Sequence, residues 1–295
     1  LATLPVHLQL FRAMGWKAPK YAHTAQLMKI DEQTGSKRKL SKRKDPELAL
    51  TYYNQQGYPA PSVLEYLMTL LNSNFEEWRR ANPDKPMSDF PFSTKKMSGS
   101  GALFDIDKLK DVSKNVISRM PAEAVYDAVA AWSEKNDPAF HALFTREPDK
   151  TRAFLAIGRG GKKPRKDIAL WSDVKPYMDF LFDELFQPDY TLPEHVSKDD
   201  AKAILQEFKA QFDENDTPDG FFAKMKAIAV EHGFAAETKA YKQDPSQYKG
   251  HVGDVSMVVC IAVAGRQNAP DMQSVMHIMG KEQVQARLEQ CIAAL

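Results

Sequence analysis

Apolar side chains recur at helical spacing over most of the chain that follows residue 120. An apolar residue at every third or fourth position places the whole set on one face of an α-helix. Such repeats run through residues 122–132, 174–185, 204–212, 221–228 and 284–295. We therefore predict a mainly helical region in which these faces meet in a core and do not line a ligand site.

Signals for helix starts precede three of these repeats. Pro121 suits the first turn of a helix, where a backbone N–H is not needed. Ser197 with Asp200 matches the pattern of a capping box, in which each side chain satisfies a backbone N–H of the other residue. Thr217 and Pro218 are likewise typical of a helix N-cap and first helical position, and they precede the repeat at residues 221–228. These residues predict three helix starts.

Two other segments need a separate interpretation. Residues 255–264 form an apolar run that fits either a buried strand or a helix. We predict a helix, because Asp254 before the run and Gly265 after it are typical of helix ends. Apolar residues between positions 4 and 14 also follow a helical rhythm, which suggests a chain that begins inside a domain.

The overall charge is nearly balanced, with 40 Lys and Arg against 39 Asp and Glu in 295 residues and a formal net charge of +1. Affinity for a polyanion must therefore come from local basic clusters. No apolar run approaches the roughly 20 residues of a membrane span. Cys260 and Cys291 lie in apolar surroundings without metal spacing, which predicts reduced thiols and no bound metal. We expect a cytoplasmic protein without membrane contact.

The densest basic cluster covers residues 37–44, of which six are Lys or Arg. Gly35 and Ser36 precede it as a flexible lead, and Asp45 and Pro46 follow it as candidates for the N-cap and first position of a helix. Lysines beside the positive end of a helix would hold a phosphate group. A solvated charge run, or a patch that binds RNA without sequence preference, is the alternative.

A second basic cluster covers residues 159–166, between two predicted helices. It is not a Walker phosphate loop, because Ala156 stands where a glycine is required and Lys163 where Ser or Thr is required. The dinucleotide pattern that begins at Gly158 fails at the same lysine. A nucleic-acid contact and a mobile solvated loop both remain open, since two adjacent glycines favour mobility.

Several motifs follow one another in a fixed order. Residues 39–43 read Lys-Leu-Ser-Lys-Arg, residues 57–64 read Gly-Tyr-Pro-Ala-Pro-Ser-Val-Leu, and residues 100–109 read Ser-Gly-Ala-Leu-Phe-Asp-Ile-Asp-Lys-Leu. Gly-Asp-Val-Ser-Met at 253–257 and Ala-Gly-Arg at 264–266 complete the series. In this order the motifs resemble glutamyl-tRNA synthetases, which are class I aminoacyl-tRNA synthetases, and the likeness extends over essentially the whole chain.

This resemblance implies a function for the first basic cluster, because class I synthetases hold the phosphates of ATP with the segment that resembles residues 39–43. The resemblance implies four catalytic residues: Lys39, Ser41, Lys42 and Arg43. Of these, Lys39 and Lys42 would bind ATP. Leu27 and Met28 would line the adenine site, although core packing explains them equally well. Mg²⁺ is expected with ATP in the intact enzyme.

The resemblance also implies partners, namely tRNA(Glu), glutamate and ATP, with no protein partner expected. Arg159 best matches an arginine with which the family reads an anticodon base, and a guanidinium suits that task because it presents a rigid fork of donors. The other cations of the second cluster would contact phosphates: Lys162, Lys163, Arg165 and Lys166. Helical anticodon-binding domains are typical of the bacterial type, whereas glutaminyl and eukaryotic-type relatives use β-barrels.

One family motif is missing from this sequence. Class I synthetases place a pair of neighbouring histidines against the ATP phosphates, and none of the seven histidines here has a close second histidine. We therefore interpret the chain as a C-terminal fragment that does not form glutamyl adenylate by itself. A stand-alone tRNA-binding module without catalysis is the alternative, and a helical scaffold with two incidental basic loops is a third reading.

The expected fold class is mainly α. Residues 1–48 would be the remnant of a class I α/β catalytic domain, and residues 49–120 an α-rich region that contacts the acceptor stem. Residues 121–215 and 216–295 would be two helical anticodon-binding subdomains.

Overall fold

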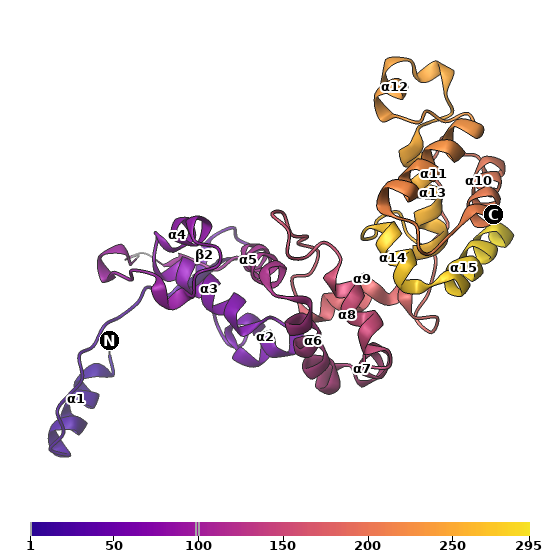
Figure 1. The fold of residues 1–295 in the computed structure, drawn as a ribbon. Helices are drawn as coiled ribbons and strands as arrows, with labels where there is room; N and C mark the ends of the chain where they lie inside the picture. Colours follow the sequence, from indigo (N-terminus) through magenta and orange to yellow (C-terminus); the bar gives the residue numbers. More distant parts are fainter. Residues whose placement is uncertain (1, 98, 100) are drawn as a thin grey trace. The chain divides into compact units, whose positions relative to one another are not determined.

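The computed structural model describes residues 2–97, 99 and 101–295. The chain forms two compact units, Leu1–Val116 and Ile117–Leu295 (Figure 1). Helices dominate both units, and a small sheet lies in the first. The predicted mainly α fold class is confirmed. Among the residues that the structure describes, none of the helices combines the length and the apolar character that crossing a membrane requires.

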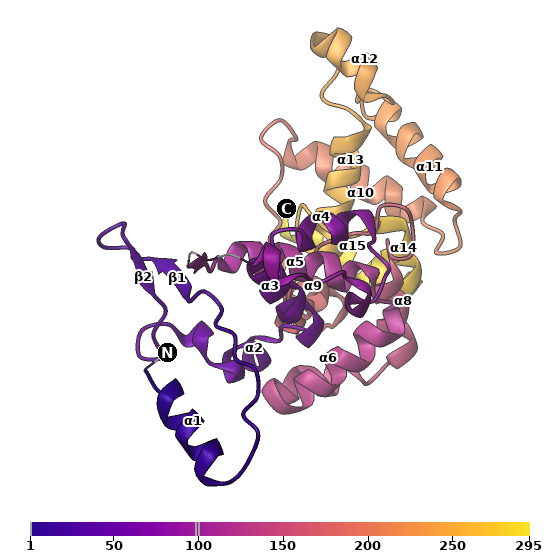
Figure 2. The ribbon, with the colours of Figure 1, turned by 90° about the vertical axis from the view of Figure 1, so that its left-hand side faces the viewer.

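The three-stranded sheet of the first unit carries part of the first basic cluster. β1 (Leu27–Ile30) lies in the middle, antiparallel to β2 (Lys37–Lys39) and parallel to β3 (Ala102–Leu103). Figure 2 shows β1 and β2 side by side, joined by a hairpin turn. The residue pairs are Met28 with Lys39 and Ile30 with Lys37 at the two ends of the ladder.

Hydrogen bonds order the turn between β1 and β2. The Asp31 carboxylate accepts bonds from the backbone N–H groups of Gln33 and Thr34, both at 3.1 Å. Gly35 takes a left-handed conformation with φ 66°, which glycine adopts without steric cost. The expectation of a flexible lead before the basic cluster is therefore wrong, because the segment is a hydrogen-bonded hairpin turn.

Short helices precede and follow the strands of this sheet along the chain. The first unit contains α1 (Leu4–Ala13), the 3-10 turn η1 (Pro46–Leu48), α2 (Leu50–Gln56), α3 (Ala60–Leu71), α4 (Phe75–Ala81), the 3-10 turns η2 (Met87–Asp89) and η3 (Thr94–Lys96), and most of α5 (Ile106–Arg119). The predicted helical rhythm at the start of the chain is confirmed by α1, although this helix buries none of its residues.

Two of the sequence motifs lie close together in the first unit. The Tyr66 hydroxyl, on the helix α3 that begins within residues 57–64, accepts a 2.6 Å hydrogen bond from the backbone N–H of Asp105. The rings of Tyr66 and Phe104 meet edge to face with centroids 5.3 Å apart. Ser100, with which the second of these motifs begins, lies outside the described residues. Phe104 and Asp105 of the second motif therefore support the fold through contacts with the helix that carries the first.

The second unit is built from helices and 3-10 turns. They are α6 (Ala122–Asn136), α7 (Pro138–Phe144), α8 (Pro148–Ala156), η4 (Trp171–Asp173), α9 (Val174–Met178), η5 (Asp179–Leu181), α10 (Lys198–Gln211), α11 (Pro218–Glu231), α12 (Thr238–Gln243), η6 (Pro245–Gln247), α13 (Val252–Ala264), α14 (Met272–Met279) and α15 (Lys281–Ala294). One apolar cluster includes buried residues from Ile117 to Cys291 and so draws on both sides of position 215. The division into four parts stays a prediction.

Most helix ends lie where the sequence places them. The Ser197 hydroxyl accepts a hydrogen bond from the N–H of Asp200 at 3.0 Å, and the Thr217 hydroxyl accepts one from the N–H of Gly220 at 3.1 Å. The apolar run at 255–264 is helical, as predicted, and α13 ends at a left-handed glycine. These caps satisfy N–H groups that a helix cannot satisfy internally.

The predicted helix over residues 174–185 is wrong beyond Met178. Helix α9 ends there, the 3-10 turn η5 follows, and Phe182 is extended. Phe180, Leu181 and Phe182 are all buried. Three consecutive residues cannot all lie on one face of an amphipathic helix, so the tighter turn and the extended residue bury what a continued helix would expose.

Candidate functional site

The cations at positions 37–39 are divided between two faces because they lie on a strand. Successive side chains of a strand point to opposite faces. Lys37 and Lys39 are exposed, whereas Arg38 between them is partly buried. Strand pairing places Arg38 opposite Lys29 of β1. The strand therefore directs the Arg38 side chain to one face of the sheet and the Lys37 and Lys39 side chains to the other.

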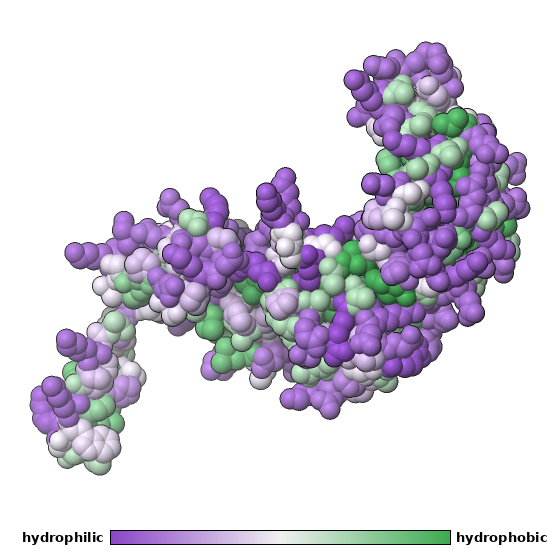
Figure 3. Space-filling model, in the orientation of Figure 1, coloured by the Kyte–Doolittle hydropathy of each residue, from purple (hydrophilic) through white to green (hydrophobic). Residues whose placement is uncertain are grey.

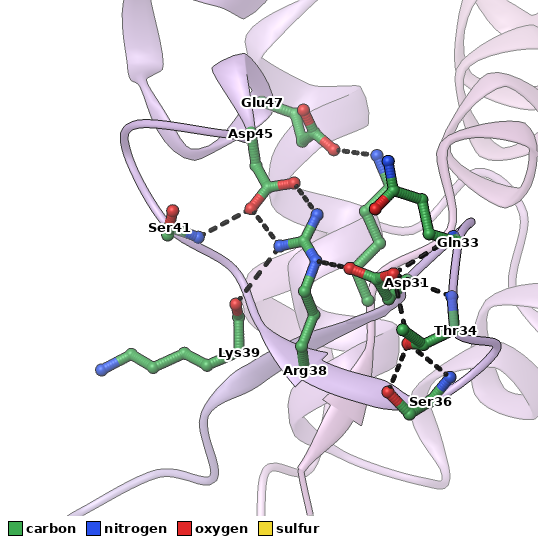
Figure 4. A network of polar contacts seen from close by, with 10 residues as sticks. Asp31, Gln33, Thr34, Ser36, Arg38, Lys39, Ser41, Asp45 and Glu47 are labelled. Carbon is green, nitrogen blue, oxygen red and sulfur yellow. Dashed lines mark hydrogen bonds and ion pairs between the residues drawn. The ribbon is translucent and has the colours of Figure 1, made fainter.

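Two carboxylates hold Arg38 (Figure 4). Its two terminal nitrogens, Nη1 and Nη2, donate to the two carboxylate oxygens of Asp45 at 2.6 and 2.7 Å, and its Nε donates to Asp31 at 3.1 Å. Asp45 is only 1% exposed, and a buried charge of this kind requires a hydrogen-bonded partner. The Arg38 guanidinium, assisted by the Ser41 N–H, lowers the pKa of Asp45 to about 2.

A second ion pair balances the cation that faces Arg38. Lys29 Nζ donates to a carboxylate oxygen of Glu47 at 2.7 Å, and this hydrogen bond raises the pKa of Lys29. Like charges directly opposite each other on paired strands are destabilising. Asp45 and Glu47, one on each side of Pro46, therefore offset the repulsion between Arg38 and Lys29.

The segment between the strand and η1 is a tight turn. The backbone N–H groups of Lys44 and Asp45 donate to the Ser41 carbonyl at 3.1 and 2.9 Å. In return, the Ser41 N–H donates to the Asp45 carboxylate at 2.7 Å. The predicted function of Ser41 in shaping this loop is consistent with these bonds, which are made by its backbone.

Four exposed cations lie on or beside this turn: Lys39, Lys42, Arg43 and Lys44. None of their side chains forms an ion pair with another described residue. The structure thus brings three of the predicted catalytic side chains, those of Lys39, Lys42 and Arg43, onto one short segment with Ser41. Crowded cations without carboxylate partners are suited to a polyanion such as a triphosphate.

The helix expected after the basic cluster is only one 3-10 turn. Asp45 and Pro46 occupy the predicted N-cap and first positions of η1, but the Asp45 side chain makes no capping hydrogen bond to it. Its oxygens accept from Arg38 and Ser41 instead. The expectation of a helix dipole beside the lysines is therefore wrong, because three residues align too few peptide units.

We predict that Asp45 stabilises the fold in a pH-dependent way. Its folded-state pKa of about 2 lies below the ordinary value of 3.8, so its ionised form stabilises the fold above about pH 4 and this contribution is lost as the pH falls toward 2. Asp45→Asn should lower the midpoint of thermal unfolding near pH 6 and change it much less near pH 2. An equal change at both pH values would contradict this prediction.

The two residues predicted for the adenine site lie next to each other on β1. Adjacent side chains of a strand point to opposite faces, so only one of Leu27 and Met28 can face a given ligand through its side chain. Met28 packs against Gly101, which directly precedes β3, since a Cβ at Gly101 would lie 2.4 Å from the Met28 Cγ. The adenine-site assignment stays a prediction.

The carboxylates around the turn do not fit the Mg²⁺ expected with ATP. Asp31, Asp45 and Glu47 each accept hydrogen bonds from a cationic side chain, which leaves them unsuited to act as metal ligands. In the part of the chain that the structure describes, no group of three or more His, Cys, Asp or Glu side chains is arranged to hold a metal ion.

The second basic cluster forms a loop between α8 and η4. In Figure 3 its projecting tip is hydrophilic. The loop is closed at its base, where the Arg165 N–H donates to the Gly158 carbonyl at 3.0 Å and Arg165 Nε donates to Asp167 at 2.6 Å. Gly158 has φ 70°, and a Cβ there would lie 2.7 Å from the Arg165 side chain. Glycine is therefore required at this position.

Arg165 is thus engaged within the protein, while three lysines of the loop are exposed and form no ion pair with a described residue: Lys162, Lys163 and Lys166. These three are placed to meet phosphates, whereas Arg165 shapes the loop that carries them.

Arg159 folds back onto the ends of two helices. Its Nε donates to the Leu155 carbonyl of α8 at 2.6 Å, and one terminal nitrogen donates to the Ile117 carbonyl of α5 at 2.7 Å. Burial lowers the pKa of this guanidinium. Its donors bind carbonyls at helix ends, and the Ile117 carbonyl also accepts from the Met120 N–H at 3.1 Å. Base reading by Arg159 stays a prediction, since much of its donor fork is occupied here.

We predict that the three exposed lysines contribute salt-dependent affinity for RNA. Each lost phosphate contact reduces the slope of log K against log salt by roughly 0.7 to 0.9, so the change of all three to alanine should reduce it by about 2. Filter binding to tRNA over a range of salt concentrations measures this slope. The same reduction after alanine substitution of Lys135, Lys198 and Lys239, exposed lysines elsewhere in the unit, would contradict a specific function of the loop.

Comparison with known proteins finds relatives of the second unit. Residues 163–292 match the family described as anticodon binding domain. The solved structure of a glutamate tRNA ligase from Elizabethkingia meningosepticum, in complex with its amino acid, shares the fold with a TM-score of 0.63 and 18% identity, over 100% of this chain and 56% of that chain. Most of the second unit is therefore similar to an anticodon binding domain, and its fold is that of the solved ligase.

Curated relatives match at higher identity. Glutamate–tRNA ligase from Acetivibrio thermocellus is 49% identical over 292 residues, which is 99% of this chain and 53% of the relative. The enzyme of the same name from Clostridium perfringens is 44% identical over 297 residues, again 99% of this chain and 53% of the relative. The chain spans about half the length of the curated relatives it matches, and over nearly all of its own length it is similar to glutamate–tRNA ligases.

Sequence reasoning missed the carboxylates that organise the first basic cluster. Asp31 and Glu47 belong to no motif in the sequence, and the sequence predicts Asp45 only as a helix cap. A signal was present, because acidic residues flank the cluster on both sides and a strand period divides its cations.

Proposed function

We propose that this chain provides the tRNA-binding part of a glutamate–tRNA ligase, together with the basic turn that holds the triphosphate of ATP. The observation that carries the proposal is the match of nearly the whole chain to glutamate–tRNA ligases at up to 49% identity, with exposed Lys39 and Lys42 in its Lys-Leu-Ser-Lys-Arg segment. The function belongs to the full-length protein, in the cytoplasm, with ATP, glutamate and tRNA(Glu) as its substrates.

In the proposed reaction, a carboxylate oxygen of glutamate attacks the α-phosphorus of ATP and the bond to the bridging oxygen of pyrophosphate breaks. Negative charge grows on the leaving pyrophosphate. Lys39 and Lys42 would offset this charge, with Arg43 assisting, because ammonium groups aimed at developing charge lower the barrier. The attacking carboxylate is already ionised, so no residue is needed as a general base.

The second unit would then position the tRNA whose terminal hydroxyl accepts the glutamyl group. We propose that Lys162, Lys163 and Lys166 contact phosphates, which fix position without reading sequence. Specificity for tRNA(Glu) would come from residues that contact anticodon bases, and Arg159 is the candidate that resemblance supplies.

Exchange of labelled pyrophosphate into ATP tests the proposal. In the presence of glutamate and tRNA, the full-length protein should catalyse exchange, whereas residues 1–295 alone should not. Exchange by this chain alone would contradict the view that it lacks the rest of the catalytic domain. No exchange by the full-length protein would contradict the proposed activity.

A tRNA-binding module without catalysis is the second candidate. It is favoured by the match of residues 163–292 to the anticodon binding domain family, which includes none of the basic turn at residues 37–44. Retention of tRNA binding by a full-length protein that shows no exchange and no aminoacylation would select this candidate.

A further inference from the structure

We propose that Arg38 and Asp45 are positioning residues that set the conformation of the turn carrying Lys39 and Lys42. The inference rests on the proposed function, because it concerns the same triphosphate site. It adds two residues to which neither the sequence motif nor the family match assigns this task.

The Asp45 carboxylate joins three points of the chain. One of its oxygens accepts hydrogen bonds from Arg38 at 2.6 Å and from the Ser41 N–H at 2.7 Å, and the other accepts from Arg38 at 2.7 Å. Arg38 lies before the turn, Ser41 within it, and Asp45 at its end. A single buried carboxylate therefore fixes the path of the backbone between residues 38 and 45.

Arg38 extends this network into the hairpin. Its Nε donates to Asp31, whose other oxygen accepts from backbone N–H groups of the β1–β2 turn. Figure 4 shows the Arg38 guanidinium between Asp31 and Asp45, with the Lys39 side chain directed away from it. The strand alternation that directs Arg38 toward the carboxylates directs Lys39 outward, so the position of one side chain determines that of the other.

Direct contact between Arg38 and phosphate is not favoured by this arrangement. All three of its side-chain nitrogens donate to carboxylates, one of which is 1% exposed. Release of Arg38 to a ligand would leave the buried Asp45 charge without a cationic partner, with only the Ser41 N–H still bound to it, which is strongly unfavourable. Arg38 therefore acts through the turn, and Lys39 and Lys42 make the contacts with substrate.

Kinetics of the full-length protein test this inference. Arg38→Met and Asp45→Asn should each lower kcat for pyrophosphate exchange about 10- to 100-fold, with a smaller change in KM for glutamate. Arg38→Lys should restore part of the loss, since an ammonium keeps the charge but not the two-pronged contact. Lys37→Met removes an exposed neighbouring cation from the same strand and should change kcat at most about threefold.

A double-mutant cycle separates positioning from general destabilisation. If Arg38 acts through Lys42, then Arg38→Met should cost at most about threefold when Lys42 is already alanine. Thermal unfolding and circular dichroism establish that each variant is folded at the assay temperature. A full additional 10- to 100-fold loss in the Lys42→Ala background would overturn the inference.

Limited tryptic digestion gives a readout that does not depend on catalysis. Loss of the Asp45 contacts should release the turn, so cleavage after Lys42 and Arg43 should be about tenfold faster in folded Asp45→Asn than in wild type, and unchanged in Lys37→Met. If Lys42→Ala abolishes exchange while Arg38→Met and Asp45→Asn match Lys37→Met in kinetics and digestion, the positioning inference fails and the proposed function survives. If Lys42→Ala has no effect, the proposed function itself fails.

Discussion

Replacement of Lys42 by alanine in the full-length protein should slow glutamate-dependent pyrophosphate exchange by a factor of about 10² to 10³. This is the scale for one lost donor that acts on charge developing in the transition state. Lys42 is exposed on the turn and has no ion-pair partner among the described residues, so its ammonium is free to meet phosphate. The expected effect is on kcat, because the charge on pyrophosphate grows as the bond breaks.

The same substitution should leave stability almost unchanged, because an exposed side chain without partners contributes little to the fold. Thermal unfolding measures this directly. Lys37→Ala, which removes an equal charge from an exposed position of β2, is the matched control and should exchange at nearly the wild-type rate. Wild-type exchange by Lys42→Ala would remove the basis for assigning the triphosphate to this turn.

Replacement of Arg159 by alanine should lower the free energy of unfolding of the second unit by about 2 to 3 kcal/mol. Hydrogen bonds from a charged donor contribute about 1.5 to 3 kcal/mol, and their loss leaves the Leu155 and Ile117 carbonyls without that partner. Urea unfolding of the protein, followed by circular dichroism, measures the change. The effect is expected in the absence of RNA.

Arg146→Ala provides the matched control for Arg159. Arg146 pairs with Glu184 on the surface of the same unit, with both side chains about half exposed, and such pairs contribute about 0 to 1 kcal/mol. Unchanged stability in Arg159→Ala would reject the helix-end contacts as the main function of Arg159. Base reading would then be favoured if wild type binds a tRNA with one altered anticodon base more weakly, whereas Arg159→Ala binds the altered and native tRNAs equally.

The helices of the second unit could be predicted because their information is local. Apolar spacing placed α10 and α11, and the hydroxyls of Ser197 and Thr217 marked their first residues. The helix at 255–264 was also predictable, although its apolar run fitted a strand, because Gly265 ends it in a left-handed conformation.

The features that sequence did not predict depend on distant parts of the chain. A run of cations has no local preference for a strand, and β2 exists because Leu27–Ile30 and the distant β3 complete its sheet. Pairing of Arg38 with Asp45 follows from that strand. Where helix α9 ends early, Arg266 of a distant segment donates to the Pro176 carbonyl at 2.7 Å and forms an ion pair with Asp179.

The contacts of Arg159 were missed for the same reason. The Ile117 carbonyl that it satisfies lies 42 positions earlier in the sequence. Its motif position suggested a donor fork presented to RNA, whereas its surroundings engage that fork with helix ends. Local sequence identified the residue, and only the fold revealed its partners.

The central claim is that the helical unit positions a particular tRNA, and binding of tRNA(Glu) to residues 1–295 tests it most directly. Affinity should be measured at one fixed salt concentration for the native transcript and for transcripts with single anticodon substitutions. The account predicts a loss of at least about tenfold for one or more substitutions, the scale of one lost base contact. Equal affinity for every transcript would contradict it.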